Sequence, residues 1–564
     1  STPLYSSAAS DVYKRQIDNT HSEYEGKLYA SSSNTLTDGS SQGHYTVNNG
    51  QYSQTYADVL VNINKRIQDF TIVANIGASY SGVTSKELGY AGPIRETGIP
   101  NLFNVYDLDN AKKRATQVGW REATESIFAS AEVGWKSMLY LTVTGRNDWA
   151  SQLTHSPQAS FFYPSVGLSA VITEMLKLPD WVDYLKVRGS FSSVGNPYPR
   201  FLTYPTYSYD ANKQDWKSQT NYPIGKLYPE RTDSWEVGLD ATLFKDFKLS
   251  GSFYYANTYN QTFDPRLPVS SGYDKLYVQT GYVRNYGFEA MLSYGHRWGD
   301  FGWDSSFTFS ANKNEIVELV KDYVHPETGK TYNVDKLELK TDEGRGFGKA
   351  KFILKEGGTL GDLYTHADLK RDINGNILID DSGNVTAIDN AGDIKLGSVL
   401  PKANLAWNNS FSYKGINAGF LLTARLGGIV YSATQAYLDL YGVSETSAAA
   451  RDAGGVWING RSHVNPQSFY EVVASQSGLP TYYTYSATNL RLQEAHIGYT
   501  VPRRWLGNVC DINVSLVGRN LWMIYCKAPF DPEAVATTNN YYQGIDYFMM
   551  PSTRNIGFNI KINF

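Results

Sequence analysis

The chain has 564 residues, and its 51 Lys and Arg against 55 Asp and Glu give a formal net charge of −4. This charge offers no polybasic surface, so composition does not indicate nucleic-acid binding. No run of about 18 or more apolar residues occurs, which excludes membrane-spanning helices. The mean hydropathy of −0.39 suits a soluble protein. It suits a transmembrane β-barrel equally well, because half of each strand of a barrel faces a polar lumen.

Aromatic residues make up 14% of the chain and include 43 Tyr. Amphipathic rings suit the interfacial girdles of membrane proteins and also surfaces that bind sugars or peptides. Composition alone therefore leaves two classes open, a Tyr-rich secreted all-β protein and a membrane barrel.

The first 16 residues stand apart from the rest. No signal peptide is recognisable, and the run from Asp11 to Gln16, DVYKRQ, resembles the translation of a transposon end used to fragment DNA for sequencing. We interpret residues 1–16 as an assembly artefact joined to a gene fragment that covers residues 17–564. The natural amino terminus is then expected upstream of this sequence.

From residue 55 onward the chain predicts a monotonous series of β-strands separated by turn residues. The expected strands are 55–66, 70–80, 122–134, 137–147, 161–175, 185–195, 234–244, 247–262, 283–298, 303–317, 404–414, 416–431, 490–502, 511–524 and 554–564. A further strand is expected around residues 24–32. Most of these strands have ten or more residues, which is long enough to cross a bilayer at a tilt.

The expected strands alternate between apolar and polar residues. In the last strand Ile556, Phe558, Ile560, Ile562 and Phe564 fall on one face, while Asn, Gly and Lys residues fall on the other. This period-two pattern, with β-branched or aromatic residues on one face, predicts a sheet with one apolar face and one wet face.

Connections of two lengths alternate along the chain. Short turns are expected at Gln68-Asp69, Lys245-Asp246, Gly299-Asp300 and Lys414-Gly415. Long segments are expected at 81–121, 196–233, 318–403, 432–489 and 525–553. Outer-membrane barrels sort their connections in this way, with short periplasmic turns and long extracellular loops. If the chain ends in the periplasm, every long segment from residue 55 onward lies outside the cell.

These patterns predict an all-β fold, a transmembrane antiparallel β-barrel. The strand count is 15 or 16, whereas a plugged transporter barrel has about 22 strands. The barrel is therefore expected to be incomplete and to lack a plug domain. The terminal Phe564 matches the aromatic residue on which outer-membrane barrels end, and we interpret it as a barrel-assembly signal.

Nothing in the sequence predicts an enzyme. The chain has eight His and none of them forms an H-x-x-x-H pair, and neither a G-x-S-x-G nor a phosphate-binding loop pattern occurs. The two cysteines, Cys510 and Cys526, flank an expected strand. Sixteen extended residues span roughly 50 Å, far beyond the reach of a disulfide, so two free thiols are expected.

One acidic segment, Asp372 to Asn376 (DINGN), invites a calcium interpretation. An EF-hand loop needs Gly at its sixth position and Glu at its twelfth, but here Gly375 is fourth and Gly383 is twelfth. Asn374-Gly375 instead predicts a hairpin turn between short strands of a loop. We expect no metal site and no cofactor.

Several short motifs together resemble the barrel of SusC/RagA-type TonB-dependent transporters of the Bacteroidetes outer membrane. They run from about residue 55 to the end and are GRNDWAS (Gly145–Ser151), FFYPSVGLS (Phe161–Ser169), LPDW (Leu178–Trp181), LKVRGSFSSVGN (Leu185–Asn196), YPERTDSWEVGLD (Tyr228–Asp240), NYGFEAML (Asn285–Leu292), LGSVLPKANLAWNNSFSYKG (Leu396–Gly415), NLRLQEAHIGYTVP (Asn489–Pro502), GRNLW (Gly518–Trp522) and DPE (Asp531–Glu533).

The resemblance implies active import of oligosaccharides, or of peptides in the RagA branch. It implies a SusD-like surface lipoprotein as a lid over the extracellular loops. It also implies energy from the TonB–ExbB–ExbD complex, contacted through an amino-terminal part that this chain lacks. Two rival interpretations are a passive porin-like barrel and a secreted all-β protein that binds glycans or mediates adhesion.

Candidate contact residues come from the expected long loops and from the wet face of the strands. Loop tyrosines can stack on sugars or accommodate peptide side chains, although loop packing or contact with the lid is the alternative; they are Tyr482, Tyr483, Tyr485, Tyr541, Tyr542 and Tyr547. Four charged residues are expected to project into the lumen, as solvated wall residues or as partners of the plug; they are Glu236, Arg425, Arg491 and Lys561.

Overall fold

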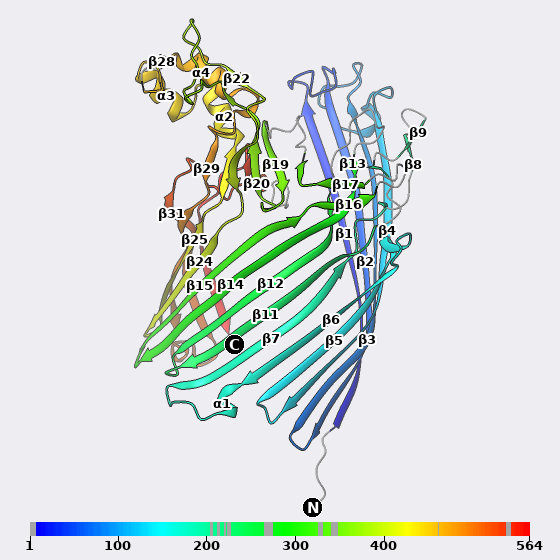
Figure 1. Cartoon of the computed structure of the whole chain (residues 1–564), viewed down its shortest axis with the longest axis vertical. Helices are drawn as coiled ribbons and strands as arrows, with labels where there is room; N and C mark the ends of the chain where they lie inside the picture. The colour runs from blue at the N-terminus through cyan, green and yellow to red at the C-terminus, as the bar shows by residue number, and fades with distance from the viewer. Residues whose placement is uncertain are drawn as a thin grey trace, which may run out of the picture. The chain divides into compact units, whose positions relative to one another are not determined.

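The fold is given by a computed structural model (Figure 1), which describes residues 7–202, 207–210, 215–218, 221–222, 227–263, 275–324, 331–339, 348–460, 462–536 and 543–563. It is dominated by strands, as the period-two pattern predicts. Among the described residues no helix is long and apolar enough to cross a membrane.

Sixteen strands form the principal sheet, and they are hydrogen-bonded in the order in which they occur along the chain. Their bounds are β1 (Ser7–Tyr29), β2 (Gly43–Ile67), β3 (Phe70–Pro93), β4 (Arg114–Trp135), β5 (Leu139–Ala150), β6 (Ser160–Val171), β7 (Val182–Asn196), β11 (Glu230–Leu243), β12 (Phe247–Phe263), β14 (Val278–Trp298), β15 (Phe301–Glu318), β24 (Ala403–Tyr413), β25 (Ile416–Leu426), β30 (Asn489–Val501), β31 (Asp511–Cys526) and β33 (Asn555–Asn563). The all-β prediction and the large antiparallel sheet are confirmed.

The chain divides into two compact units. Unit 1 comprises residues 1–168, 191–232 and 267–279, and unit 2 comprises residues 169–190, 233–266 and 280–564. In unit 1, β1 to β5 pair antiparallel with their chain neighbours. In unit 2, β14, β15, β24, β25, β30, β31 and β33 do the same.

Each expected strand overlaps one strand of the sheet, but some bounds differ. Strands β3 and β4 continue in register as far as the pair Ala91–Arg114, so the connection expected at 81–121 is only 94–113. The strand expected at 416–431 stops at Leu426, because Gly427 and Gly428 adopt φ values of 76° and 82°. These left-handed conformations end a strand and are natural for glycine.

The four short turns are confirmed. In the turn after β24, Lys414 and Gly415 have φ values of 45° and 91°, and Tyr413 pairs with Ile416. Two successive residues with positive φ define the two-residue hairpin turn whose twist matches that of the flanking strands. Two-residue turns also join β2 to β3 and β14 to β15, each with positive φ at its first residue only. Residues 244–246 join β11 to β12, and the first two of them have positive φ.

Residues 1–16 were interpreted as an artefact, and that interpretation stays a prediction. In the structure, Ser7 to Gln16 form the first part of β1 and pair with β2 from Lys65 to Tyr56. The aromatic end of the chain, Phe564, lies outside the described residues.

The connections of unit 2 contain further secondary structure, which we call the cap. It has a four-stranded sheet of β18 (Lys336–Leu339), β19 (Ala350–Lys355), β20 (Asp362–Thr365) and β23 (Ile394–Ser398), and a three-stranded sheet of β29 (Thr484–Ser486), β26 (Ile429–Ser432) and β32 (Ile545–Asp546). It also has helices α2 (Ala433–Leu440), α3 (Glu445–Asp452) and α4 (Pro466–Val473), and the hairpins β21 (Asp368–Leu369) with β22 (Ala387–Ile388) and β27 (Val456–Ile458) with β28 (Ser462–Val464). Figure 1 shows the cap gathered at one end of the long strands of unit 2.

The remaining short elements are not part of the cap. They are the hairpins β8 (Tyr207–Asp210) with β9 (Asp215–Ser218) and β16 (Val320–Val324) with β17 (Thr331–Val334), the parallel pair β10 (Asn221–Tyr222) with β13 (Lys275–Leu276), and the single-turn helix α1 (Ile172–Met175). Helix α1 occupies the end of the strand expected at 161–175, so β6 stops at Val171.

Apolar side chains pack differently in the long strands and in the cap. On β33, Phe558 is 77% exposed and its apolar neighbours on the same face are exposed as well. In the cap, Phe352, Ile353, Leu363 and Tyr431 are completely buried. The long strands thus leave apolar side chains exposed, whereas the cap has a closed hydrophobic core.

Unit 1 has a small core of its own. Leu153 and Phe161 pack with Tyr198, Leu202 and Leu227, all of them buried. Beside it, the Arg146 guanidinium donates to the Asp148 carboxylate at 2.7 Å and to the Ser126 hydroxyl at 2.6 Å. These contacts fix the segment that carries Trp149, whose indole is half exposed. An indole at the end of a barrel strand is favourable at a membrane interface.

The two cysteines are free, as predicted; Cys510 directly precedes β31 and Cys526 is its last residue.

Candidate functional site

The candidate site of unit 2 is built on two neighbouring rows of residues that cross the sheet. In the first row Glu289 pairs with Ser310, Ser310 with Asn404, Asn404 with Arg425, and Arg425 with Asn489. Residues paired across antiparallel strands lie on the same face, so all of these polar side chains share one face of the sheet.

The second row lies two residues further along each strand and therefore on the same face. It runs through Met291, Thr308, Ala406, Thr423 and Arg491. The row between the two lies on the opposite face and is apolar; it contains Ala290, Phe309, Leu405, Ala424 and Leu490. The alternation predicted from sequence thus produces one polar face and one apolar face.

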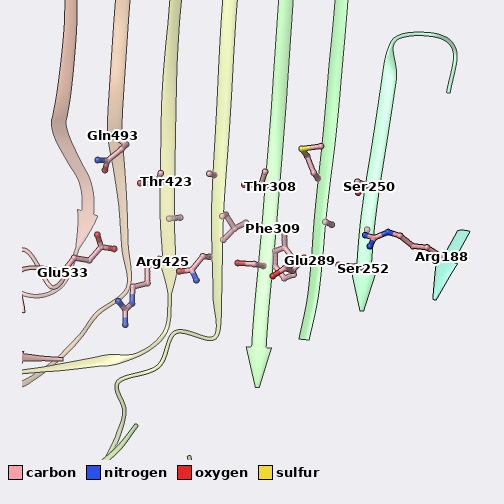
Figure 2. Close-up of a pocket in the computed structure, with 18 residues that line it drawn as sticks. Arg188, Ser250, Ser252, Glu289, Thr308, Phe309, Thr423, Arg425, Gln493 and Glu533 are labelled. Atoms are coloured by element: carbon pink, nitrogen blue, oxygen red, sulfur yellow. The ribbon is translucent and has the colours of Figure 1, made fainter. Parts of the chain in front are cut away.

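A cavity of about 790 Å³ opens on the polar face. Figure 2 shows the residues around it, with Arg425 and Glu533 at one side of the cavity and Glu289, Ser252 and Arg188 at the other. All of the lining residues belong to unit 2. The cavity therefore brings together four charged side chains that lie far apart in the sequence.

Arg188, one of these four charged residues, is held by ion pairs with neighbouring carboxylates. Arg188 on β7 donates to the Glu236 carboxylate at 2.7 Å and lies 3.6 Å from the carboxylate of Asp240. Asp240 in turn accepts from the Ser250 hydroxyl at 2.7 Å. Glu236, which was expected on the lumenal wall, therefore serves to hold Arg188 beside the cavity.

Arg491 is held even more firmly. Its side chain is 6% exposed, and its guanidinium donates two hydrogen bonds to the Asp531 carboxylate, at 2.9 and 3.2 Å. The same guanidinium lies 3.1 Å from the Glu533 carboxylate and donates to the Asn489 side chain at 3.3 Å. This pairing gives the DPE motif a structural role.

Arg491 was expected to be a solvated wall residue or a partner of the plug, and the solvated alternative is wrong. A guanidinium buried to this degree needs carboxylate partners, because an unpaired buried charge is very costly. The loop residues Asp531 and Glu533 supply them. The register prediction placed Arg491 on the correct face, but sequence alone gave no sign that the chain itself would cover it.

Arg425 and Glu289 differ from these paired residues. Arg425 donates one hydrogen bond, from Nη2 to the Val399 carbonyl at 2.7 Å, and its buried Nε has no partner among the described residues. Glu533 attracts Arg425 electrostatically but is already bound by Arg491 and Asn489. Within the described part of the chain, neither Arg425 nor Glu289 forms an ion pair.

Lys561 lies on β33, where its backbone pairs with Asn513. It is exposed and is not part of the cavity lining. Its position on the polar face agrees with the alternation, and its relation to a plug stays a prediction.

The loop tyrosines occupy different environments in the cap. Tyr483 is buried, and its hydroxyl donates to the Asp439 carboxylate at 2.9 Å. Tyr485 packs edge-on against Phe530, with ring centroids 5.6 Å apart, and burial raises the pKa of its hydroxyl to about 12. Tyr482 packs edge-on against Phe469. These contacts are internal to the cap.

Tyr547 is the most exposed of the four described tyrosines that were predicted as contacts. It packs near Tyr437, and both rings line a second cavity of about 640 Å³ in the cap. Tyr541 and Tyr542 lie outside the described residues. The role of all six tyrosines in contacting a substrate or a lid stays a prediction.

Sequence reasoning missed most of the second cavity. Lys349, which pairs with Asp389 at 2.6 Å, lines it together with His366, Gln476 and Ser477. These residues come from segments more than a hundred positions apart, and no short motif joins them. A weak signal was available in the Tyr-rich loops, but only folding of the cap brings the residues together.

The DINGN segment forms the predicted hairpin turn. Asp372 accepts from the backbone N–H groups of Asn374 and Asn376, both at 2.8 Å, and Gly375 has a φ of 83°. These hydrogen bonds, that from the Asn376 side chain foremost, lower the pKa of the Asp372 carboxyl. Among the described residues, no three His, Cys, Asp or Glu side chains gather to hold a metal ion.

A large antiparallel sheet with one apolar and one polar face, and with long folded connections, is typical of outer-membrane β-barrel proteins. The family model described as "TonB dependent receptor-like, beta-barrel" matches residues 4–521. The chain belongs to this family, whose members are outer-membrane receptors and transporters rather than enzymes.

Curated relatives of the chain have similar names. TonB-dependent receptor P3 of Formosa agariphila is 24% identical over 524 residues, which are 86% of this chain and 50% of that protein. TonB-dependent receptor SusC of Bacteroides thetaiotaomicron is 24% identical over 433 residues, which are 70% of this chain and 40% of that protein. The chain spans about half the length of the curated relatives it matches.

Solved structures agree on the fold. The structure of the RagAB peptide transporter superposes with a TM-score of 0.74 at 18% identity, covering 100% of this chain and 60% of the other. The RagAB peptide importer in its "closed-closed" state gives a TM-score of 0.73 at 17% identity, covering 100% of this chain and 61% of the other. The predicted SusC/RagA resemblance and the outer-membrane location are confirmed.

Proposed function

We propose that the chain forms barrel wall and extracellular loops of a TonB-dependent importer of oligosaccharides or peptides. The observation that carries the proposal is the joint presence of a polar, charged face on an outer-membrane sheet and a folded cap over the same unit. A passive pore needs no cap with a hydrophobic core. A transporter that captures substrate before moving it does need a structured surface.

The proposed partners follow from the SusC/RagA resemblance. A SusD-like surface lipoprotein docks on the cap and closes over the substrate. The TonB–ExbB–ExbD complex supplies the energy for import by the complete receptor. The similarity to a RagAB peptide transporter supports a peptide, and the SusC resemblance supports an oligosaccharide.

Uptake by the complete receptor in its host tests this function. Deleting the gene should abolish growth on the oligosaccharide or peptide that the receptor imports, when that compound is the sole nutrient. Inactivating TonB should have the same effect. Growth that persists without TonB would instead identify a passive porin-like barrel.

The role of the predicted loop tyrosine needs a separate measurement. Tyr547→Ala should weaken binding of substrate or lid to the complete receptor, because this side chain lines the cap cavity. Tyr441→Ala is the matched control, since Tyr441 is 74% exposed and lies outside that cavity. Equal affinities for the two variants would remove Tyr547 from the contact surface.

A further inference from the structure

The cavity on the polar face carries two charges of opposite sign that form no ion pair with any described residue. Glu289 and Arg425 stand in the same cross-strand row, separated only by Ser310 and Asn404. The other charged lining residues, Arg188 and Glu533, are held in ion pairs. A charged side chain that lines a cavity without a salt-bridge partner is a candidate for ligand binding.

The spacing of these two charges follows from sheet geometry. Three strand-to-strand steps separate Glu289 from Arg425, and each step measures about 4.8 Å, so the two backbone positions lie about 14 Å apart. An extended peptide advances about 3.3 Å per residue. About four residues therefore span the distance between a carboxylate at one end and a guanidinium at the other.

The groups between the two charges suit a peptide backbone. Ser310 and Asn404 lie between Glu289 and Arg425 in the row, and both line the cavity. A hydroxyl and an amide can donate to and accept from peptide N–H and C=O groups. Arg425 donates one of its five N–H groups to the Val399 carbonyl, and the remaining N–H groups of its terminal nitrogens can donate to a carboxylate.

Among the described residues, the lining of the cavity contains no aromatic side chain on the polar face. Phe309 is the one aromatic residue in the lining, and it belongs to the apolar row, where it packs against Phe288 with centroids 6.3 Å apart. Recognition in this cavity therefore depends on charges and hydrogen bonds.

We propose that this cavity is a subsite for a short peptide with free termini, whose ammonium group binds Glu289 and whose carboxylate binds Arg425. This inference deepens the proposed function and depends on it, because it names the peptide branch of the substrates. According to this inference, Glu289 and Arg425 bind the ligand and do not contact a plug.

Binding to the complete receptor, purified in detergent without TonB, tests the subsite. The probes are tetra-alanine, its amino-acetylated form, its carboxyl-amidated form, and maltotetraose. Side chains of alanine carry no charge, so only the termini can interact with Glu289 and Arg425. We expect tetra-alanine to bind about tenfold or more tightly than either capped form, since one charge-assisted hydrogen bond is lost in each.

Two variants assign each terminus to one side chain. Arg425→Gln should remove the preference for a free carboxylate over the amide and keep the preference for a free amino terminus. Glu289→Gln should do the reverse. Arg519→Gln and Glu315→Gln are matched controls from outside the cavity and should keep both preferences. A merely structural role would change the affinities for all probes together.

Three outcomes would overturn the inference. Preferences that are unchanged in both variants would show that the termini bind elsewhere. Maltotetraose binding that is lost in the variants would identify a sugar subsite. Variants that lower thermal stability and leave every affinity unchanged would assign the two charges to a plug contact. Binding is measured without TonB, so a negative result for this subsite does not determine the result of the uptake experiment.

Discussion

The strands of unit 2 and the cap of the same unit arrange their apolar residues in opposite ways. On β31 and β33, Leu516 and Phe558 are 54% and 77% exposed. In the cap, Phe352 and Tyr431 are fully buried, and the Tyr431 hydroxyl donates to the Ser477 carbonyl at 2.6 Å. The comparison shows that one chain is built for two solvents, lipid around its strands and water around its loops.

Ion pairs also differ in burial within unit 2. The buried Arg491 is satisfied by carboxylates that come from the loop joining β31 to β33. The Lys349–Asp389 pair of the cap lies closer to the surface. Buried pairs hold one arrangement firmly when both partners are present, whereas exposed pairs contribute little.

The largest expected effect comes from emptying the core of the cap. Phe352→Ala removes a fully buried ring and should destabilise the cap by about 3–5 kcal/mol. Hydrogen exchange of β19 and β20 should accelerate while exchange in the long strands stays unchanged. Ile373→Ala is the control, because Ile373 is fully exposed, and it should change neither. Equal acceleration in the long strands would contradict the separation of the two regions.

Breaking the pair that joins strand and loop should have a comparable but more local effect. Arg491→Ala leaves Asp531 and Glu533 without their cation, at a cost of about 3–5 kcal/mol. Limited proteolysis should then cut the loop that follows β31 at much lower protease concentration. Arg519→Ala removes an exposed pair with Glu494 and should cost no more than about 1 kcal/mol. Equal protection of the loop in the two variants would refute the role of Arg491.

A charge placed on the apolar face should have the next largest effect. Leu516→Arg puts a guanidinium among lipid chains and should destabilise the folded protein by about 2–4 kcal/mol near the bilayer midplane. Ser515→Arg places the same charge on the polar face and should be nearly neutral. The measurement is reversible unfolding in lipid vesicles. If both substitutions were neutral, the two faces would have been assigned incorrectly.

The smallest expected effect is a dependence on pH. Burial raises the pKa of the Asp531 carboxyl, but hydrogen bonds from the Arg491 guanidinium and the Glu533 N–H outweigh burial, so its net pKa is lowered. A lowered pKa in the folded state means that this stabilisation is complete above the ordinary Asp pKa and disappears as the pH falls through the folded value.

Proteolysis of the loop at a series of pH values checks this direction. Protection should be constant at neutral pH and should fall only below the ordinary pKa of Asp, near 4. In the Asp531→Asn variant the loop should be less protected at neutral pH, and its protection should change much less as the pH falls. A loop that becomes better protected as the pH falls would contradict the sign.

Much of the sheet could be predicted because its signals are local. Alternation in segments such as Trp235 to Leu243 placed each strand, and turn residues such as Lys414-Gly415 placed each hairpin. Strand ends were less predictable. Strands β3 and β4 run past the expected bounds because they pair with each other through polar residues. Such pairing cannot be predicted from the sequence of one strand alone.

The candidate site was predicted only in part, for the same reason. The sequence placed Arg425, Arg491 and Glu236 on the polar face, since side-chain direction follows from strand parity. It could not distinguish the paired Arg491 from the unpaired Arg425, because the partners Asp531 and Glu533 are about 40 residues away. The tyrosines of the cap showed the same limit, since Tyr483 is buried and Tyr547 is exposed.

The sequence by itself determined the class of protein, the strand faces, the short turns and the family. These features depend on neighbours along the chain and on the period of the strand. The tertiary structure alone decided which charges are neutralised, which tyrosines are buried and which rows of residues form the cavity. Those outcomes depend on contacts between distant segments, because a buried charge is satisfied by whichever carboxylate the fold brings to it.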